Sequence, residues 1–567
     1  MTDKRLQTLY LQAKSWADEA HQAGWLRSAD IDAINTIEAR TPAELFNQTE
    51  QRPLVVAFFG GTGVGKSTLL NRLSGQQIAR TGVERPTSRE VSIYVHQSIE
   101  IRQLPKEFPI EKVKIALHQD AKYQDVLWVD MPDIDSIETA NKTLVLEWLP
   151  HIDVLVYVVS PERYRDDQGW RLLLEHGHRH AWMFVINQWD KGQPSQREDF
   201  DRQLKEAGFQ SPIILCTDSR SEDEGDPDDL DELSQTIRSL ANSHTIGELE
   251  KRGVYVRLRE LRDAVLQASQ KFGSEESFES LKSQWHTQWD KTSLELQEGL
   301  AWQIAQAAEQ FASRDANLLP RTLKQLRGKN EHTKEHETPP PPKVELNELW
   351  NDWAQTRVDD ALDSLIVEAG NLAIPSSPLR PGIDNIRQTS KELIQARLRS
   401  ALGTALLKPG SAFHRLFYRA TSVLSTLLPL LALSWIAYRV IVGFYLSGTS
   451  PDQYLGINFT THSVLLVATA WLLPYFAHRK LKPSIQKAAL KGLQIGLMKG
   501  LAEIGQQISQ EIEEFHNRKK GLVATAKDIA DACSAKDIEA PRIDDAALSR
   551  MLSGHNAFMH SKHTKAG

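Results

Sequence analysis

The residues most clearly suited to chemistry are eight consecutive ones, Gly60 to Ser67, which read Gly-Gly-Thr-Gly-Val-Gly-Lys-Ser. Their spacing is G-x-x-x-x-G-K-[ST], in which glycines let backbone N–H groups converge on a phosphate. Lys66 adds a charge for the β- and γ-phosphates, and the Ser67 hydroxyl suits Mg²⁺. A strand pattern precedes the run and a helix pattern follows it, which argues against an ordinary glycine turn. The expected phosphate-contacting residues are Gly60, Gly61, Thr62, Gly63, Val64, Gly65, Lys66, Ser67 and Thr68.

Two further residues are placed to complete a metal and phosphate site. Asp130 ends an apolar run, where a carboxylate at the edge of a parallel sheet can hold Mg²⁺. Thr87 is expected to close on the γ-phosphate and the metal as a switch, and Ser88 is the alternative. The metal ligands expected from the sequence are Ser67, Thr87 and Asp130, and the catalytic residues are Lys66, Thr87 and Asp130.

A third segment, Asn187-Gln188-Trp189-Asp190, is suited to reading a base. The Asp190 carboxylate can accept both N1–H and the exocyclic N2–H of guanine. Adenine lacks that donor pair, so GTP is expected in preference to ATP. Cys216 and Thr217 end the last apolar run, where a backbone amide is expected to meet guanine O6.

These residues follow short apolar runs that alternate with helical stretches. The runs cover residues 54–59, 126–129, 154–159, 182–186 and 213–215. Strands that are apolar on both faces and alternate with helices are typical of a parallel sheet covered by helices. The fold expected is therefore an α/β domain with a parallel-rich sheet, joined to a long all-α region.

Composition narrows the class of protein. The 567 residues include 67 basic and 74 acidic side chains, a net charge of -7, so nucleic acid is an unlikely main partner. Cys216 and Cys533 are the two cysteines, and their wide spacing supports neither a disulfide framework nor a zinc site. The N-terminal residues have no continuous apolar run, which argues against a cleaved signal peptide. The nucleotide site is expected in the cytoplasm.

Two polar segments resemble metal sites but are expected to be solvated surface. The acidic run at 221–232 is typical of an exposed loop. The histidines at 176, 178 and 180 are expected in the last turn of a helix that ends at Gly177.

The helical half contains a candidate membrane hairpin. Residues 421–446 are apolar except for Arg439 and long enough to span a bilayer, whereas 463–477 need residues 454–461 to do so. Basic residues flank the pair at Arg415, Arg419, Arg479, Lys480 and Lys482, while the connecting loop has only Asp452. Both ends of the chain are therefore expected in the cytoplasm. The alternative is a buried hairpin of a soluble protein.

The last long helical pattern has two stripes. Apolar residues from Leu490 to Phe515 recur at spacings of three and four, which indicates a core or coiled-coil face. Ala488, Gly492, Gly496 and Gly500 recur every four residues, which predicts a close approach by another helix. The segments expected are 1–50 (helical), 51–243 (nucleotide-binding), 244–410 (helical, with a proline spacer at 339–342), 411–482 (hairpin) and 483–567 (helical).

On these motifs and their order, residues 53–220 resemble a GTPase domain of the translation-factor-related class, near the Era-like and dynamin-like groups. The resemblance implies five motifs, at 60–67, 87, 130–133, 187–190 and 216–219. Three residues depart from the family pattern. Asp133 replaces a glycine of the third motif, Ile134 stands where a glutamine would orient water, and Gln188 replaces a lysine. Asp133 is expected to weaken coupling of the γ-phosphate to the second switch, and Gln188 to weaken base stacking and nucleotide affinity. Because of Ile134, slow unaided GTP hydrolysis is expected.

The layout of head, helical region and hairpin resembles bacterial dynamin-like and mitofusin-like proteins. That resemblance implies an inner-membrane GTPase whose heads pair as a nucleotide-dependent homodimer or oligomer to tether or remodel a lipid bilayer. The alternative is a switch in which GTP and GDP control binding of a protein partner without remodelling.

Overall fold

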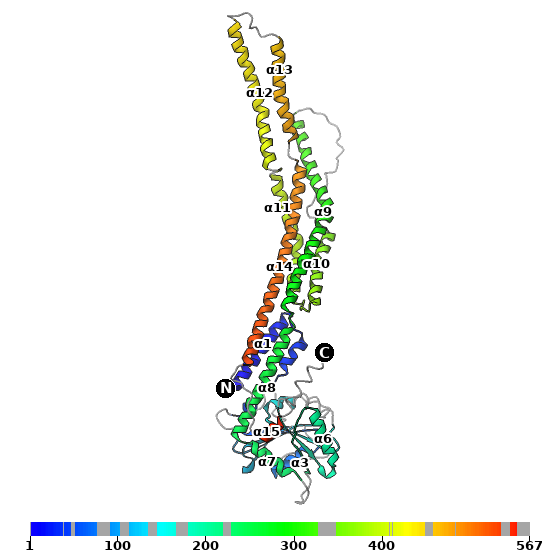
Figure 1. Cartoon of the computed structure of the whole chain (residues 1–567), viewed down its shortest axis with the longest axis vertical. Helices are drawn as coiled ribbons and strands as arrows, with labels where there is room; N and C mark the ends of the chain where they lie inside the picture. The colour runs from blue at the N-terminus through cyan, green and yellow to red at the C-terminus, as the bar shows by residue number, and fades with distance from the viewer. Residues whose placement is uncertain are drawn as a thin grey trace. The chain divides into compact units, whose positions relative to one another are not determined.

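The computed structural model describes two compact units with labelled elements (Figure 1). One comprises Met1–Gln270 with Gly521–Gly567, and the other Lys271–Lys520. The described residues are 2–37, 39–46, 52–75, 91–101, 113–133, 145–165, 180–218, 228–326, 348–407, 409–410, 412–447, 457–481, 484–534 and 545–552. The finer segment boundaries expected from the sequence stay a prediction.

The first unit is built on a seven-stranded sheet in the order β3-β2-β4-β1-β5-β6-β7. Its strands are β1 (Leu54–Phe59), β2 (Val91–His96), β3 (Val113–His118), β4 (Val126–Asp130), β5 (Val154–Val159), β6 (Ala181–Asn187) and β7 (Ile214–Thr217). Strands β4, β1, β5, β6 and β7 are parallel, while β2 is antiparallel to β4 and β3 is parallel to β2. The parallel-rich sheet and its five apolar strands are confirmed to within two residues, but β2 and β3 were missed.

Helices cover both faces of this sheet because its strands are apolar on both sides. The helices of this unit are α1 (Thr2–Gln22), α2 (Ser28–Asn35), α3 (Lys66–Ser74), α6 (Pro194–Glu206), α7 (Leu230–Leu240), α8 (Ser243–Gln270) and α15 (Ala546–Met551), with short turns η1 (Pro42–Leu45), η3 (Ala121–Tyr123), η4 (Leu149–His151) and η5 (Trp189–Lys191). Phe200 and Leu204 of α6 pack on one face, and Leu69 of α3 and Ile237 of α7 on the other. The helices thus pack on both faces of the sheet, and the expected site residues follow the ends of its strands.

The C-terminal part of α14 (Ile485–Cys533) belongs to the first unit. The indole N–H of Trp16 in α1 donates to the Leu522 carbonyl at 2.9 Å, and Arg5 donates to the Ala532 carbonyl at 2.9 Å. Helix α1 also packs against α8. Segments from both ends of the sequence therefore form one helical layer of this unit.

The second unit is helical and confirms both stripes predicted for residues 483 onward. Its helices are α9 (Glu275–Leu326), α10 (Asp352–Asn371), α11 (Arg380–Leu407), α12 (Ala412–Ser447), α13 (Ile457–Lys480) and most of α14. The apolar residues of α14 from Leu493 to Phe515 are buried. A Cβ placed on Gly496 would lie 2.9 Å from the Leu398 Cα of α11. Glycine therefore permits this helix pair to touch backbone to backbone.

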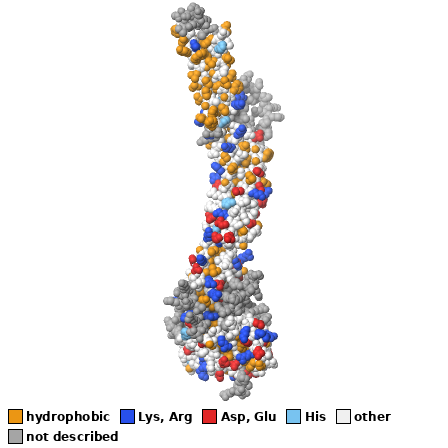
Figure 2. All heavy atoms as spheres, viewed as in Figure 1, with side chains coloured by type: hydrophobic (Ala, Val, Ile, Leu, Met, Phe, Trp, Pro, Cys, Tyr) orange, Lys and Arg blue, Asp and Glu red, His pale blue; other side chains and the backbone are white. Residues whose placement is uncertain are grey.

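Helices α12 and α13 form the hairpin, and they lie side by side with an apolar surface (Figures 1 and 2). Both are long and apolar enough to cross a membrane by length and composition, and only 6% of the most apolar stretch of each is buried. Helix α13 begins at Ile457 and has 24 residues, about 36 Å, so it takes in residues before 463 as expected. The exposed apolar surface is the opposite of what a buried soluble hairpin would have.

Candidate functional site

The loop from Gly60 to Ser67 joins the end of β1 to the start of α3. Gly63 and Gly65 have φ values of 78° and 89°, a region that favours glycine. A Cβ on Gly60 would lie 2.2 Å from the Val158 carbonyl oxygen of β5, so this position has no room for a side chain. The loop therefore passes close to the sheet edge and presents the N-terminus of α3, where an anion is favoured.

Lys66 and Ser67 begin α3 and extend toward the end of β4. The Ser67 hydroxyl donates to Oδ2 of Asp130 at 2.6 Å. Burial raises the pKa of Asp130, against the opposing effects of the Lys66 charge and the Ser67 hydrogen bond. The other oxygen of Asp130 is buried and has no hydrogen-bond partner in the described part of the chain. A buried acceptor next to a hydroxyl is the kind of donor set that a hard cation requires.

Asp133 takes a position that the sequence did not reveal. The Lys66 ammonium donates to Oδ1 of Asp133 at 2.5 Å, and both side chains are buried. Lys66 also donates to the carbonyls of Gly60 at 2.9 Å and Gly61 at 3.0 Å. The residue that departs from the family glycine thus supplies a carboxylate to the lysine expected to bind phosphate.

The Asn187 to Asp190 segment is tied to the same loop. The Asn187 amide donates to the carbonyls of Val64 at 2.9 Å and Gly65 at 3.2 Å, and accepts from the Thr217 hydroxyl at 3.2 Å. Gln188 has a left-handed backbone with φ 60°, and its amide donates to the Gly63 carbonyl at 3.0 Å. Gln188 therefore braces the loop from the position where the family has lysine.

The two segments expected to meet a base lie at the ends of neighbouring strands. Asn187 of β6 pairs in register with Thr217 of β7, and Asp190 lies on η5 with an exposed carboxylate. The backbone amide of Cys216 donates to the Asp229 carboxylate at 2.8 Å. The contact to guanine O6 therefore stays a prediction for a backbone amide that follows Cys216. Burial raises the pKa of the Cys216 thiol to about 11, so the thiol is neutral at physiological pH.

Several expected residues lie outside the described residues. These are Thr87, Ser88, Ile134, Ser219, the histidines at 176 and 178, the acidic run at 221–227 and the prolines at 339–342. The described residues contain no group of three or more His, Cys, Asp or Glu side chains that could hold a metal.

Sequence reasoning missed two contacts that shape the site. Arg163 follows β5 and donates to the Thr62 carbonyl of the loop at 2.8 Å. Arg72 of α3 pairs with Asp228 and donates to the Asp218 carbonyl. Each partner is far away in sequence, so only the arrangement of strands brings them together.

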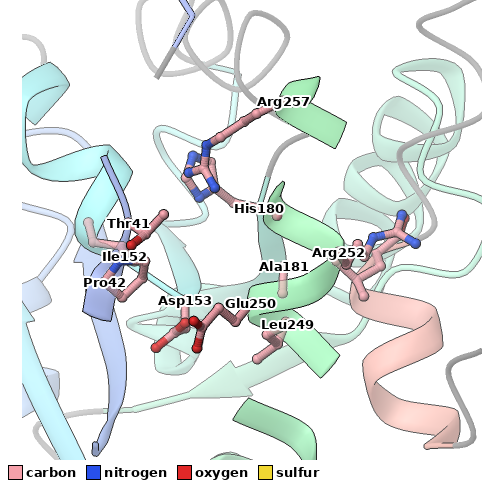
Figure 3. A pocket seen from close by; sticks show the side chains of 12 residues that line it. Thr41, Pro42, Ile152, Asp153, His180, Ala181, Leu249, Glu250, Arg252 and Arg257 are labelled. Atoms are coloured by element: carbon pink, nitrogen blue, oxygen red, sulfur yellow. The ribbon is translucent and has the colours of Figure 1, made fainter. Parts of the chain in front are cut away.

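A small cavity lies at the edge of the sheet where the parallel strands begin, opposite the phosphate-binding loop (Figure 3). Asp153 and His180 directly precede β5 and β6, and α8 brings Glu250 and Arg257 to the same place. The cavity volume is about 20 Å³, room for a single water. Arg52 forms a bidentate pair with Asp153 at 2.7 and 3.0 Å. His180 is buried before a strand, so its prediction as a last-turn helical residue was wrong.

One family model and several solved structures are similar to parts of this chain. Residues 55–188 match the model of the family described as 50S ribosome-binding GTPase. No curated protein matches the chain. A solved structure of an oligomerised bacterial dynamin pair, described as providing a mechanism for long range sensing and tethering of membranes, is 12% identical, with 88% of this chain and 90% of that chain covered and a TM-score of 0.39. Era from Aquifex aeolicus, bound to GDP and AlF4-, is 21% identical, with 33% and 56% covered and a TM-score of 0.24.

The family match covers the first strand, the phosphate-binding loop and the sheet as far as Gln188. It therefore includes the first three expected motifs and the start of the fourth, while the fifth, at 216–219, lies beyond it. The strand order and the positions of Lys66, Ser67 and Asp130 fit the same class. The chain therefore contains a P-loop GTPase domain, which includes residues 55–188.

Proposed function

We propose that the chain is a membrane-anchored GTPase that hydrolyses GTP with Mg²⁺ and couples pairing of its heads to membrane tethering or remodelling. One observation carries the catalytic part of this proposal. Lys66 and Ser67, adjacent on the first turn of α3, meet the carboxylates of Asp133 and Asp130 at the end of β4. Phosphoryl transfer requires a lysine, a hydroxyl and a metal-binding carboxylate around one phosphate site, and these residues lie together here.

The residues present fit Mg²⁺. Ser67 and Asp130 would supply oxygen ligands, and Thr87, which lies outside the described residues, is the third candidate. Buried oxygens of Asp130 and Asp133 have no hydrogen-bond partner among the described residues, and a bound cation would satisfy such acceptors. When bound, Mg²⁺ would neutralise charge on the β- and γ-phosphate oxygens. Lys66 would add the second positive charge.

Turnover is expected to be slow without a partner. Ile134 cannot orient a water molecule through its side chain, and Asp133 holds Lys66 in a buried ion pair. The phosphates must displace Asp133 before Lys66 can serve them. Because Asp133 competes with the phosphates for Lys66, a partner that favours the phosphate-bound state would speed turnover.

The membrane part of the proposal rests on the exposed apolar surface of α12 and α13. Two spans connected by a short loop leave both flanks on one side, and basic residues mark that side as cytoplasmic. The proposed partners are GTP and GDP, a lipid bilayer and a second copy of the chain in a nucleotide-dependent homodimer or oligomer. The proposed location is a bacterial inner membrane, with two passes and both termini in the cytoplasm.

The test is GTP hydrolysis by the purified full chain, measured across protein concentrations with and without reconstitution into vesicles. Specific activity that rises with both concentration and lipid supports coupling of head pairing to the membrane. Activity that is indifferent to both would favour the alternative, a nucleotide-gated switch for a protein partner. Lys66→Ala is the control for hydrolysis by contaminants.

A further inference from the structure

The region around the hairpin is unusually one-sided in charge. Residues 393–502 contain a single acidic side chain, Asp452. The same residues contain twelve basic ones: Arg397, Arg399, Lys408, Arg415, Arg419, Arg439, Arg479, Lys480, Lys482, Lys487, Lys491 and Lys499. Asp452 lies between α12 and α13 in the sequence, outside the described residues. The basic residues at the start of α12 and the end of α13 therefore have no carboxylate close in sequence to balance them.

The fold brings the near ends of α12 and α13 to one level. Tyr418 stacks on His478 with ring centroids 4.2 Å apart, and the Thr421 hydroxyl lies 3.3 Å from Nδ1 of His478. His414 lies 3.0 Å from the Leu481 carbonyl. These contacts join the first turns of α12 to the last turns of α13. Basic side chains on both helices must therefore share one short band around the base of the hairpin.

We define the basic collar as Arg415, Arg419, Arg479, Lys480, Lys487 and Lys491. The last two lie in the first turns of α14, within about 10 Å of its start at Ile485. Arg419, Arg479 and the three lysines are exposed, and none of these five makes an ion pair with a described residue. Figure 2 shows Lys and Arg side chains where the apolar surface of the hairpin ends. Like charges this close are unfavourable unless an anion lies among them.

Apolar side chains lie among these cations on α12. Phe413, Leu416 and Phe417 are exposed by 70%, 64% and 48% and alternate with the two arginines. Such a mixture suits the boundary between headgroups and acyl chains, where rings enter the apolar layer and cations remain with the phosphates. The occupant that matches both features is a phospholipid with a net negative headgroup.

We propose that the basic collar binds anionic phospholipids of the cytoplasmic leaflet. This inference rests on the proposed membrane anchoring and adds the lipid class. A few cations beside each span are enough to orient the hairpin in a membrane. Lys487 and Lys491 go beyond that need, because they continue the basic collar onto α14, a helix outside the apolar pair. Four to eight basic residues beside a membrane helix typically bind anionic lipids, and each is worth about fivefold in affinity near the surface.

The experiment uses the full chain reconstituted into nanodiscs that contain phosphatidylcholine with a minor fraction of phosphatidylglycerol. Lipids retained by the extracted protein are counted by native mass spectrometry. The test variant is Arg419→Gln/Lys480→Gln/Lys487→Gln. The matched control is Lys291→Gln/Arg357→Gln/Lys499→Gln, which removes the same charge from exposed positions of the same unit away from the collar.

We expect phosphatidylglycerol to be enriched several-fold over its bulk fraction in the wild type and in the control, and to return to about its bulk fraction in the test variant. High salt should reduce it. Equal retention of both lipids, or an unchanged test variant, would overturn the inference while leaving membrane anchoring intact. Loss of enrichment on adding inorganic phosphate would identify a free anion as the ligand and also overturn it. A chain that does not enter nanodiscs at all would overturn the membrane proposal as well.

Discussion

Glycine serves opposite purposes in the two units of this protein. In the first unit, Gly60 and Gly65 keep side chains out of a loop that must receive a ligand, and a Cβ at Gly65 would lie 2.3 Å from the Asn187 amide. In the second unit, Gly492 and Gly496 remove side chains so that α14 can touch α11. The same residue type therefore shapes a binding surface in one unit and a helix contact in the other.

Because of this difference, substitutions in the two units should affect different properties of the protein. The loop is held by hydrogen bonds from Asn187, Gln188 and Arg163 to its carbonyls. The helix pair is held by packing, in which each methyl group matters. Substitutions in the first unit should change nucleotide binding, and those in the second should change unfolding.

The largest effect is expected for Lys66→Ala. It removes the charge expected to meet the β- and γ-phosphates, so GTP affinity should fall at least about 100-fold. Equilibrium binding of a fluorescent GTP analogue measures it. The variant leaves the Asp133 carboxylate buried without its cation, so Lys66→Ala/Asp133→Ala serves as the folding control. Unchanged affinity in both variants would contradict the site.

The next largest effect is expected for Gly496→Ala, which is compared with a second glycine substitution on the same helix, α14. Gly496→Ala places a methyl group 3.0 Å from the Arg397 carbonyl, so the second unit should lose about 1–3 kcal/mol of stability with unchanged GTP binding. Gly521→Ala is the matched control, because a Cβ there meets nothing within 4 Å. Its higher helix propensity should stabilise by up to about 1 kcal/mol. Apparent melting temperatures by circular dichroism compare them, and equal shifts would refute close packing at Gly496.

Asp133→Asn tests the internal anion. The amide keeps the shape of Asp133 but removes its charge, so Lys66 should meet phosphate more readily, and GTP affinity should rise about tenfold. The same titration with GTP measures it. A fall in affinity would instead indicate that Asp133 assists metal binding.

The smallest effect is expected at the start of α9. Glu275 binds Lys519 and accepts from His516 at 2.7 Å, and the hydrogen bond to Lys519 followed by that to His516 lowers the pKa of Glu275. A lowered folded-state pKa stabilises the fold above the usual carboxyl pKa near 4.3, and this contribution is lost as the pH falls through the folded-state value. The carboxylate is 57% exposed, so Glu275→Gln should cost under about 1 kcal/mol.

Melting temperatures of the wild type and Glu275→Gln should therefore differ at pH 7 and converge on acidification below pH 4. A difference that grows toward low pH would have the wrong sign for this pair.

The sequence predicted the parts of the fold that repeat a local pattern. The five apolar strands, the phosphate-binding loop and the glycine stripe are all visible in spacing alone. Strands β2 and β3 were missed because polar residues interrupt their apolar runs. In β3, Ile115 and Leu117 are also exposed. The Lys66–Asp133 pair could not be predicted, because it depends on β4 lying beside β1 in the sheet. The same holds for Arg163 and for the burial of His180.

The central claim is that this site binds guanine nucleotides through Asp190, and base competition tests it most directly. Xanthine has a carbonyl where guanine has its amino group, so the Asp190 carboxylate should repel it, whereas Asp190→Asn can accept N1–H and donate to that carbonyl. Competition binding of GTP, ATP and XTP should therefore show GTP preferred by the wild type and XTP by Asp190→Asn, a change of about 2–4 kcal/mol. A variant that keeps its preference for GTP, or a wild type that binds ATP equally well, would contradict the account.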